Sequence, residues 1–380
     1  MELSESSALS GEPFELHVTT SADKCSVKFP DNVLVAFDGI FRNETYYNFT
    51  GSSATITVFI PPSVSVMPVE IHSGPVLETF ELTVSRGDNP LVSGESFYDH
   101  EVYMARNFNN RDVGTLQMRR ASEHYQSYFT QLGYEAEIRT YQKSDGFRTY
   151  EVRDVIAYKW GTVHPDEWII IGGHYDIARR SIEGALDNTA GACAVVELAE
   201  GMANLKTDRT IVFGLWDGEE QGLWGSSSFA NEIPPHVDIK TNINFDMVGL
   251  NWPLQWDLAV RIGPDTDTEV VDCPELHNAT MDAWIKYLDY PEDGMNIRET
   301  TGGGSDHTSF QRLGVQTFFI ICTADYIQYH RRTDLVVDMV AYAGGQTELE
   351  SGFNSVAWLG LYLTLLMDNN NALHQLKETE

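Results

Sequence analysis

Basic residues are scarce in this sequence. Its 380 residues include 25 Lys and Arg, of which we count 8 Lys and 17 Arg, against 56 Asp and Glu, and the formal net charge is −31. A nucleic-acid binder needs clustered Lys and Arg to replace the counterions of the phosphates, and docking on an anionic membrane needs them too. The composition therefore excludes both classes of partner. The acidity indicates a well-solvated surface, with adaptation to salt as the alternative interpretation.

Long apolar runs are missing as well. No stretch approaches the roughly 18 consecutive apolar residues of a transmembrane helix, so we expect no membrane insertion. Residues 1–13 lack the charged start and the apolar stretch of a signal peptide, although a removed one stays compatible with the sequence. Three glycosylation-type triplets begin at Asn43, Asn48 and Asn278 and favour export weakly. We therefore expect an extracellular or exported protein, with a cytoplasmic location left open.

The cysteines show neither a zinc-binding nor a disulfide-dense pattern. There are four of them, Cys25, Cys193, Cys273 and Cys322, and no two form a CxxC pair. Such spacing excludes a small disulfide scaffold and a cysteine-ligated zinc site. One or two disulfides and four buried thiols are both compatible with it.

The organisation of the chain changes near residue 90. Residues 1–90 show about seven short alternating runs, separated by turn sequences such as PDN, GSS and PPS, and we expect a β-sandwich-like accessory domain. Residues 85–96 read as a linker. From residue 97 strand-like and helix-like runs alternate, and runs such as WIII and TFFII are typical of strands buried on both faces. Residues 97–380 therefore predict an α/β catalytic domain with a mainly parallel central sheet and helices on both faces.

Ionisable side chains follow the most apolar strand-like runs. His174 and Asp176 come after EWIIIGG, Glu219 and Glu220 come after RTIVFGLW, and Asp246 comes after KTNINF. Two further positions fit the pattern: Asp187, before a helix-like run, and His330, after VQTFFIICTAD. Open α/β sheets bind ligands beyond the carboxyl ends of their strands. We therefore expect these side chains to meet at one edge of the sheet.

These residue types indicate a metal centre. His and carboxylate ligands without Cys suit catalytic zinc, with cobalt or manganese as substitutes. Two His and three or four carboxylates are too many for one zinc with an open position. They fit two zinc ions roughly 3.5–4 Å apart, with one carboxylate bridging and another free as a base. Taken singly, each residue also has a plain structural explanation, such as a helix N-cap for Asp187.

At this point the residues resemble a known family. GGHYD, GALDNTAGACAVVELAE, WDGEEQGLWGS, NFDM, SDHTSF and YH are similar, in order and spacing, to the secreted zinc aminopeptidase and glutamate-carboxypeptidase-like family of co-catalytic zinc exopeptidases. The resemblance covers about residues 97–368 and leaves out the β domain. It implies five metal ligands: His174 and Asp246 on one zinc, Glu220 and His330 on the other, and Asp187 bridging both.

The resemblance also implies roles around the metals. Glu219 would be the general base, which takes a proton from a zinc-activated water and returns it to the leaving amine. Asp176 would orient His174. Tyr329 would stabilise the oxyanion, with His307 as an alternative donor.

The sequence departs from the family pattern after His330, where HRRTD places Arg331 and Arg332 beside the site. Our first interpretation is an aminopeptidase that acts on peptides. A carboxypeptidase would use Arg331, Arg332 or Arg298 on the terminal carboxylate, and a single-zinc glutaminyl cyclase is a third candidate. A non-catalytic receptor-type relative would have lost ligands, and none is lost here. Trp252, Trp256 and residues 291–301 are candidate pocket walls, while the oligomeric state and the side-chain preference stay open.

Overall fold

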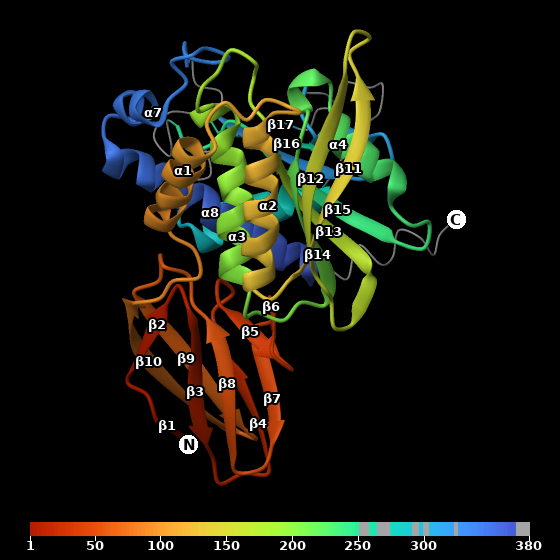
Figure 1. The fold of residues 1–380 in the computed structure, drawn as a ribbon. Coiled ribbons are helices and arrows are strands. Elements are labelled where there is room, and N and C mark those ends of the chain that lie inside the picture. The colour runs from red at the N-terminus through yellow and green to blue at the C-terminus, as the bar shows by residue number, and fades with distance from the viewer. Residues whose placement is uncertain (251–257, 264–273, 291–295, 299–303, 323–325, 370–380) are drawn as a thin grey trace.

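The computed structural model describes residues 1–250, 258–263, 274–290, 296–298, 304–322 and 326–369. Ten strands, up to Arg86, come first, and helices and strands alternate from Gly94 on (Figure 1). The helices of the described residues are α1 (Gly94–Asn107), α2 (Leu116–Gln131), α3 (Ala190–Met202), α4 (Trp224–Glu232), α5 (Pro274–Met281), α6 (His307–Gln311), α7 (Val336–Ala343) and α8 (Gln346–Asp368).

The first ten strands form a β-sandwich of two five-stranded sheets, in the orders β1-β3-β8-β5-β6 and β2-β10-β9-β4-β7. Alternate side chains such as Val18, Val27 and Ile71 are fully buried between the sheets, as the period of a strand requires. The strands are β1 (Glu2–Leu3), β2 (Ser7–Ser10), β3 (Pro13–Thr19), β4 (Lys24–Lys28), β5 (Leu34–Phe37), β6 (Ile40–Arg42), β7 (Tyr46–Thr50), β8 (Ser53–Phe59), β9 (Val66–Ser73) and β10 (Val76–Arg86).

The rest of the chain is built on one eight-stranded sheet in the order β11-β12-β14-β13-β15-β18-β16-β17. The central strands β14, β13, β15 and β18 are parallel, and β12 and β16 run antiparallel to their neighbours β14 and β18. The strands are β11 (Glu135–Ser144), β12 (Thr149–Lys159), β13 (His164–His174), β14 (Arg209–Trp216), β15 (Asp238–Phe245), β16 (Leu258–Gly263), β17 (Asn296–Arg298) and β18 (Thr317–Cys322).

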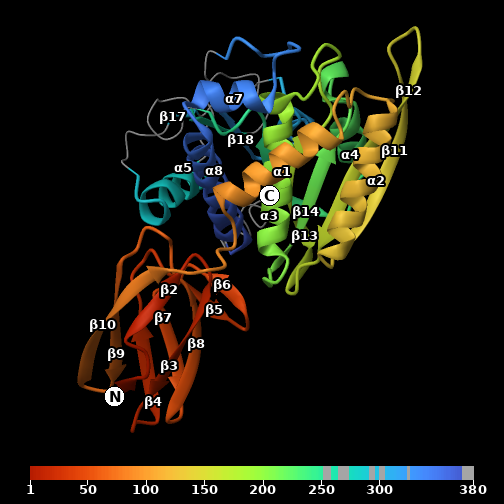
Figure 2. The same cartoon turned by 60° about the vertical axis from the view of Figure 1, so that its left-hand side comes forward.

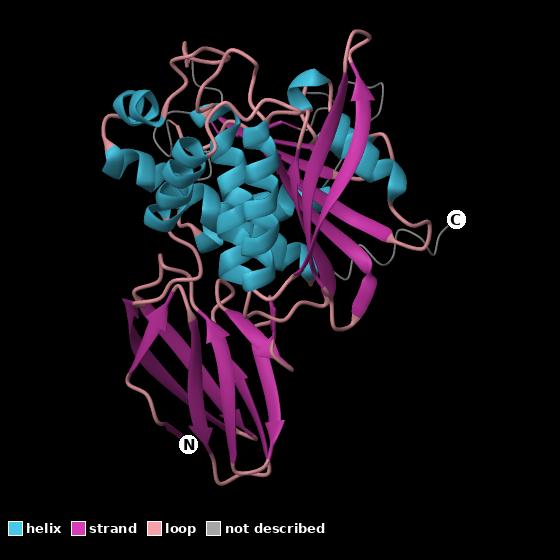
Figure 3. Ribbon diagram, in the orientation of Figure 1, coloured by secondary structure: helices cyan, strands magenta, loops and turns pink. Residues whose placement is uncertain are grey.

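Helices cover both faces of this sheet (Figure 3). α2, α3 and α8 pack on one face, α1 lies on α3 and α8, and α4 and α6 pack on the other face. Every residue of β14 is buried, because the strand has a helical layer on each side. The predicted three-layer α/β fold is thus the observed one. Among the described residues, no helix is both long enough and apolar enough to cross a membrane.

The β-sandwich is packed firmly against the amino ends of the parallel strands. Phe59 of β8 lies against Trp358 and Tyr362 of α8, with ring centroids 5.9 and 6.0 Å apart. Arg42 of β6 forms an ion pair of 3.0 Å with Asp208, which directly precedes β14. The carboxyl ends of β13 and β14 therefore point away from the sandwich, as Figures 1 and 2 show.

Phe59 links the two cores, and its truncation is expected to destabilise the protein. The side chain is fully buried and belongs to the cluster that contains Trp358. Phe59→Ala should lower the free energy of unfolding by about 3–5 kcal/mol, because apolar contacts are lost and a cavity remains. Urea unfolding measures this change. Phe147→Ala is the matched control, because this side chain is 96% exposed and should change stability by at most about 0.5 kcal/mol. Equal midpoints for the two variants would contradict the coupling of the two cores.

Candidate metal centre

The ends of neighbouring parallel strands bring the candidate ligands together. His174 is the last residue of β13, Asp246 follows β15, and Glu220 lies in the short helical turn after β14. These three strands are neighbours in the order β14-β13-β15, so their ends share one edge of the sheet. Asp187, just before α3, and His330, after β18, complete the group.

Glycines allow α3 to lie close to this edge. A Cβ on Gly191 would stand 2.4 Å from the carbonyl oxygen of Phe245, and one on Gly173 would stand 2.9 Å from the same oxygen. No side chain fits at either distance, so only glycine permits this packing. The close approach brings Asp187 to His174, with 3.4 Å between Asp187 Oδ1 and His174 Nε2.

The ligand atoms form two triads that share Asp187. The first is His174, Asp187 and Asp246, and the second is Asp187, Glu220 and His330; within each triad the donor atoms lie within 4.8 Å of one another. Nε2 of His330 is 2.9 Å from Asp187 Oδ2 and 3.2 Å from Glu220 Oε2. His330 has a left-handed backbone with φ 55°, an uncommon conformation for a side chain other than glycine that clusters at functional sites.

The residues fit a pair of metal ions. Among the described residues, Glu220 Oε1 and Asp246 Oδ1 are buried oxygens that accept no hydrogen bond. A buried carboxylate without a partner is costly, and a coordinated cation removes that cost. Imidazole and carboxylate donors suit zinc. Each triad could supply three ligands to an ion, which would leave the fourth position of a tetrahedral site for water or substrate.

The pKa shifts of the clustered side chains also favour a bound cation. Burial raises the pKa of Glu219 to about 10, against the lowering effect of His174. Burial would also raise the pKa of Asp187, but its hydrogen bonds to His174 and His330 lower it to about 2. Burial lowers the pKa of His174, yet Glu219 and the other carboxylates raise it well above its ordinary value. Hydrogen bonds to Asp187 and Glu220 raise the pKa of His330 to about 10. The cavity thus holds more carboxylate charge than its own side chains neutralise.

Asp176 supports both the His174 ring and the turn of Glu219 and Glu220. Its Oδ1 lies 3.4 Å from His174 Nδ1. The same carboxylate accepts the backbone N–H groups of Glu219 at 3.1 Å and Glu220 at 3.3 Å. Holding Nδ1 leaves Nε2 of His174 directed at Asp187 and Asp246, as a metal ligand requires.

Two supports were not predicted from the sequence. Asp334 accepts the backbone N–H groups of Leu186 at 2.9 Å and Asp187 at 3.1 Å, which holds the shared ligand in place. Arg111 is fully buried and donates to the carbonyls of Tyr175 and Glu183, in the loop after β13. Their signals in the sequence were weak: Asp334 is the last residue of the HRRTD segment, and Arg111 precedes a plain turn sequence.

Removal of Asp334 should therefore weaken metal binding without removing a ligand. Asp334→Ala frees the backbone of Leu186 and Asp187, and zinc affinity is expected to fall about 10–100-fold. Competition with a chromophoric chelator measures this change. Asp338→Ala, four residues further in α7, is the matched control and should keep the affinity of the unmodified protein. Unchanged affinity in Asp334→Ala would refute its positioning role.

The remaining predicted residues occupy different settings. Tyr329 is 46% exposed, and its ring stacks on that of His330 with centroids 3.8 Å apart. His307 is fully buried and stacks on Phe319, so it is enclosed where Tyr329 is open to solvent. Arg331 and Arg332 are exposed. Trp252, Trp256, residues 291–295, residues 299–301 and Cys273 lie outside the described residues, whereas Cys25 and Cys193 are buried free thiols.

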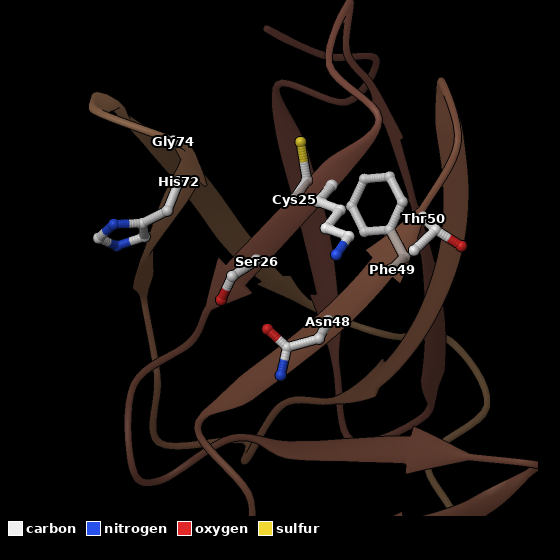
Figure 4. Close-up of a pocket in the computed structure, with 8 residues that line it drawn as sticks. Cys25, Ser26, Asn48, Phe49, Thr50, His72 and Gly74 are labelled. Carbon is white, nitrogen blue, oxygen red and sulfur yellow. The ribbon is translucent and has the colours of Figure 1, made fainter.

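A groove of about 490 Å³ lies far from this centre, on the β-sandwich. It crosses β4, β7 and β9, where Ser26, Asn48 and His72 are cross-strand neighbours (Figure 4). None of the described residues that line it carries a carboxylate. The groove therefore lacks the acid–base pair and the ligand set of the metal centre.

Known proteins resemble this chain in sequence. The model of Peptidase family M28 matches residues 154–343. A glutamate carboxypeptidase 2 homolog of Caenorhabditis elegans is 30% identical over an alignment of 183 residues, and the match covers 43% of this chain and 23% of that protein. Leupeptin-inactivating enzyme 1 of Streptomyces exfoliatus is 27% identical over an alignment of 245 residues, and the match covers 63% of this chain and 51% of that protein. The matches thus span about a quarter to a half of these relatives.

Solved structures share the fold. A zinc aminopeptidase from Bacillus subtilis superposes with a TM-score of 0.59 at 14% identity, covering 71% of this chain and 94% of that one. A glutaminyl cyclase of Porphyromonas gingivalis superposes with a TM-score of 0.56 at 19% identity, covering 72% and 99%. These likenesses confirm the predicted exopeptidase-type α/β fold.

Proposed function

Because the chain belongs to peptidase family M28, we propose that it is a zinc-dependent aminopeptidase that removes N-terminal residues from peptides. One observation carries the proposal: two His–carboxylate triads share Asp187 at the carboxyl ends of the parallel strands. A shared carboxylate is what a pair of co-catalytic metal ions requires. The surplus of carboxylates around it favours a substrate with a positively charged amine over one with a terminal carboxylate.

The five candidate ligands divide between two zinc ions. His174 and Asp246 would hold one ion, Glu220 and His330 the other, and Asp187 both. Cobalt or manganese are expected substitutes. When bound, the pair supplies a Lewis acid for the scissile carbonyl and lowers the pKa of water.

Glu219 is the proposed general base. It is nearly buried, its Oε2 lies 4.0 Å from His174 Nε2, and it belongs to neither triad. Its carboxylate is therefore free to accept the proton of the attacking water and to return it to the leaving amine. Asp176 keeps the backbone of Glu219 in place through the hydrogen bond to its N–H. Tyr329, on the open side of His330, is the proposed donor to the oxyanion.

A pair of peptides tests the direction of cleavage. We expect a peptide with free ends to shorten from its N-terminus, and its N-acetylated twin to stay intact, because acetylation removes the charged amine. Mass spectrometry of both digests over time gives the result. Shortening of both peptides from the C-terminus would replace the aminopeptidase proposal with a carboxypeptidase.

The exposed pair Arg331 and Arg332, next to His330, favours carboxypeptidase as the second candidate, since Arg binds carboxylates bidentately. Glutaminyl cyclase, the name of one structural neighbour, is the third. Zinc content separates it, because one zinc per chain in fully active protein would favour the cyclase.

We further propose that residues 1–90 are an accessory domain and residues 97–380 the catalytic domain of an exported peptidase. The sandwich contacts the second domain at the amino ends of its strands, away from the metal centre. These contacts favour a sandwich that stabilises the catalytic domain over one that covers the metal centre. The acceptor side chains Asn43, Asn48 and Asn278 are all exposed, which is compatible with export.

A further inference from the structure

A second group of potential metal ligands lies between helices, outside the metal centre. His100 of α1 and Glu197 and Glu200 of α3 direct three donor atoms to within 4.8 Å of one another. We propose that this α1–α3 cluster is an additional zinc site, which fastens α1 to α3. It shares no residue with the two triads, so it stands independently of the proposed function.

The distances suit a tetrahedral ion. Nε2 of His100 lies 2.9 Å from Oε2 of Glu200 and 3.6 Å from Oε2 of Glu197. Zinc bonds of about 2.0–2.1 Å to nitrogen and oxygen place tetrahedral ligands roughly 3.3–3.4 Å apart. The two separations from His100 lie on either side of that value, and the donor atoms of Glu197 and Glu200 lie within 4.8 Å of each other.

A buried carboxylate oxygen without a partner points into the cluster. The Glu197 side chain is only 3% exposed. Its Oε1 accepts the backbone N–H of Ser93 at 2.7 Å, whereas its Oε2, on the side of His100, accepts no hydrogen bond. The hydrogen bond to Ser93, the N-cap residue of α1, accounts for the burial of Oε1. It does not account for the burial of Oε2. A cation between Oε2 and His100 satisfies it.

On the side of Glu200, the cluster is held by a hydrogen bond and is open to solvent. The hydroxyl of Tyr128 in α2 donates to Oε2 of Glu200 at 2.6 Å, which orients this ligand as partners of metal ligands commonly do. His100 is 18% and Glu200 46% exposed. Surface cavities of about 280 and 350 Å³ border Glu200. An ion can therefore enter, and a water can take the fourth position.

A zinc ion in the α1–α3 cluster would have a structural role and no part in the peptidase reaction. Ser93, which Glu197 contacts, belongs to the segment that leads from the β-sandwich into α1. α3 begins three residues after Asp187. A zinc ion here would hold the start of the catalytic domain against the helix that follows the shared ligand. The competing interpretation is a protonated His100 paired with Glu200 and no metal.

The zinc content per chain distinguishes a zinc site from an ion pair of His100 and Glu200. The full chain is stripped with a chelator, dialysed against zinc and analysed for metal by mass spectrometry. Glu200→Gln should hold one zinc less per chain than the unmodified protein, and His100→Gln should show the same loss. In both variants peptidase activity should persist, and zinc should raise Tm less than in the unmodified protein.

Glu5→Gln is the matched control. Glu5 and His17 form a similar pair, with 2.7 Å between Oε1 and Nδ1, and within the described part of the chain no third ligand joins them. This variant should keep the full zinc content. Equal zinc content in the unmodified protein, Glu200→Gln and His100→Gln would overturn the proposal in favour of the ion pair. Failure of the metal centre would instead lower the count in all proteins alike and leave the difference of one ion intact.

Discussion

Replacing Glu219 with glutamine is expected to lower kcat by about 10²–10⁴-fold while the metal content stays unchanged. Glutamine keeps the size of the side chain but cannot accept a proton. Glu219 belongs to neither triad, so its replacement removes no ligand. The backbone N–H of residue 219 can still donate to Asp176, so the turn should keep its conformation. The effect is therefore expected in turnover rather than in fold or metal affinity.

Initial rates on the free-ended peptide and zinc content, measured on the same preparation, test this expectation. Glu232→Gln is the matched control, because the same substitution is then made at an exposed position of α4. It should leave both kcat and zinc content unchanged. Activity of Glu219→Gln within a few-fold of the unmodified protein would show that another group is the base.

Asp187→Ala is expected to abolish activity by removing both metal ions. Asp187 is the one ligand common to both triads, so its loss leaves two ligands for each ion. The effect should exceed that of Glu219→Gln, because the Lewis acid and the acidified water are lost together. Metal-free protein should nevertheless fold, since the substitution removes one negative charge from a cavity that has too many.

Metal analysis of Asp187→Ala tests the predicted loss of both ions. A thermal melt of the chelator-treated variant tests the prediction that the metal-free protein folds. Glu219→Gln serves here as the control, because it changes a carboxylate of the same cavity and should keep both ions. Full zinc occupancy in Asp187→Ala would remove the bridging assignment. Loss of fold in the metal-free variant would show that Asp187 supports the structure as well.

Local sequence patterns predicted much of the second part of the chain. Continuous apolar runs such as WIII predicted buried parallel strands, and the residues that follow these strands predicted the edge where ligands gather. The structure brings His174, Asp187 and Asp246 together there, and Glu220 and His330 beside them. The prediction was possible because neighbouring parallel strands in one sheet end at a common edge, which is a rule of topology rather than of individual contacts.

The β-sandwich was less predictable. About seven strands were expected, and ten are present. The strands β1, β2 and β6 have only two to four residues, too few for an alternating pattern to stand out. β2 pairs in parallel with β10, more than 70 residues away, so its conformation depends on a distant partner.

The amino-acid sequence by itself determined the alternation of helices and strands, the layered α/β class and the types of ligand available, because these depend on local periodicity and on residue chemistry. Only the tertiary structure decided which side chains support the ligands. Asp334 and Arg111 act through backbone groups of distant segments, and His100 meets Glu197 across two helices. Such contacts join residues at no regular sequence separation, so no sequence pattern predicts them. They arise when separately formed elements pack together and bury polar groups that then need partners.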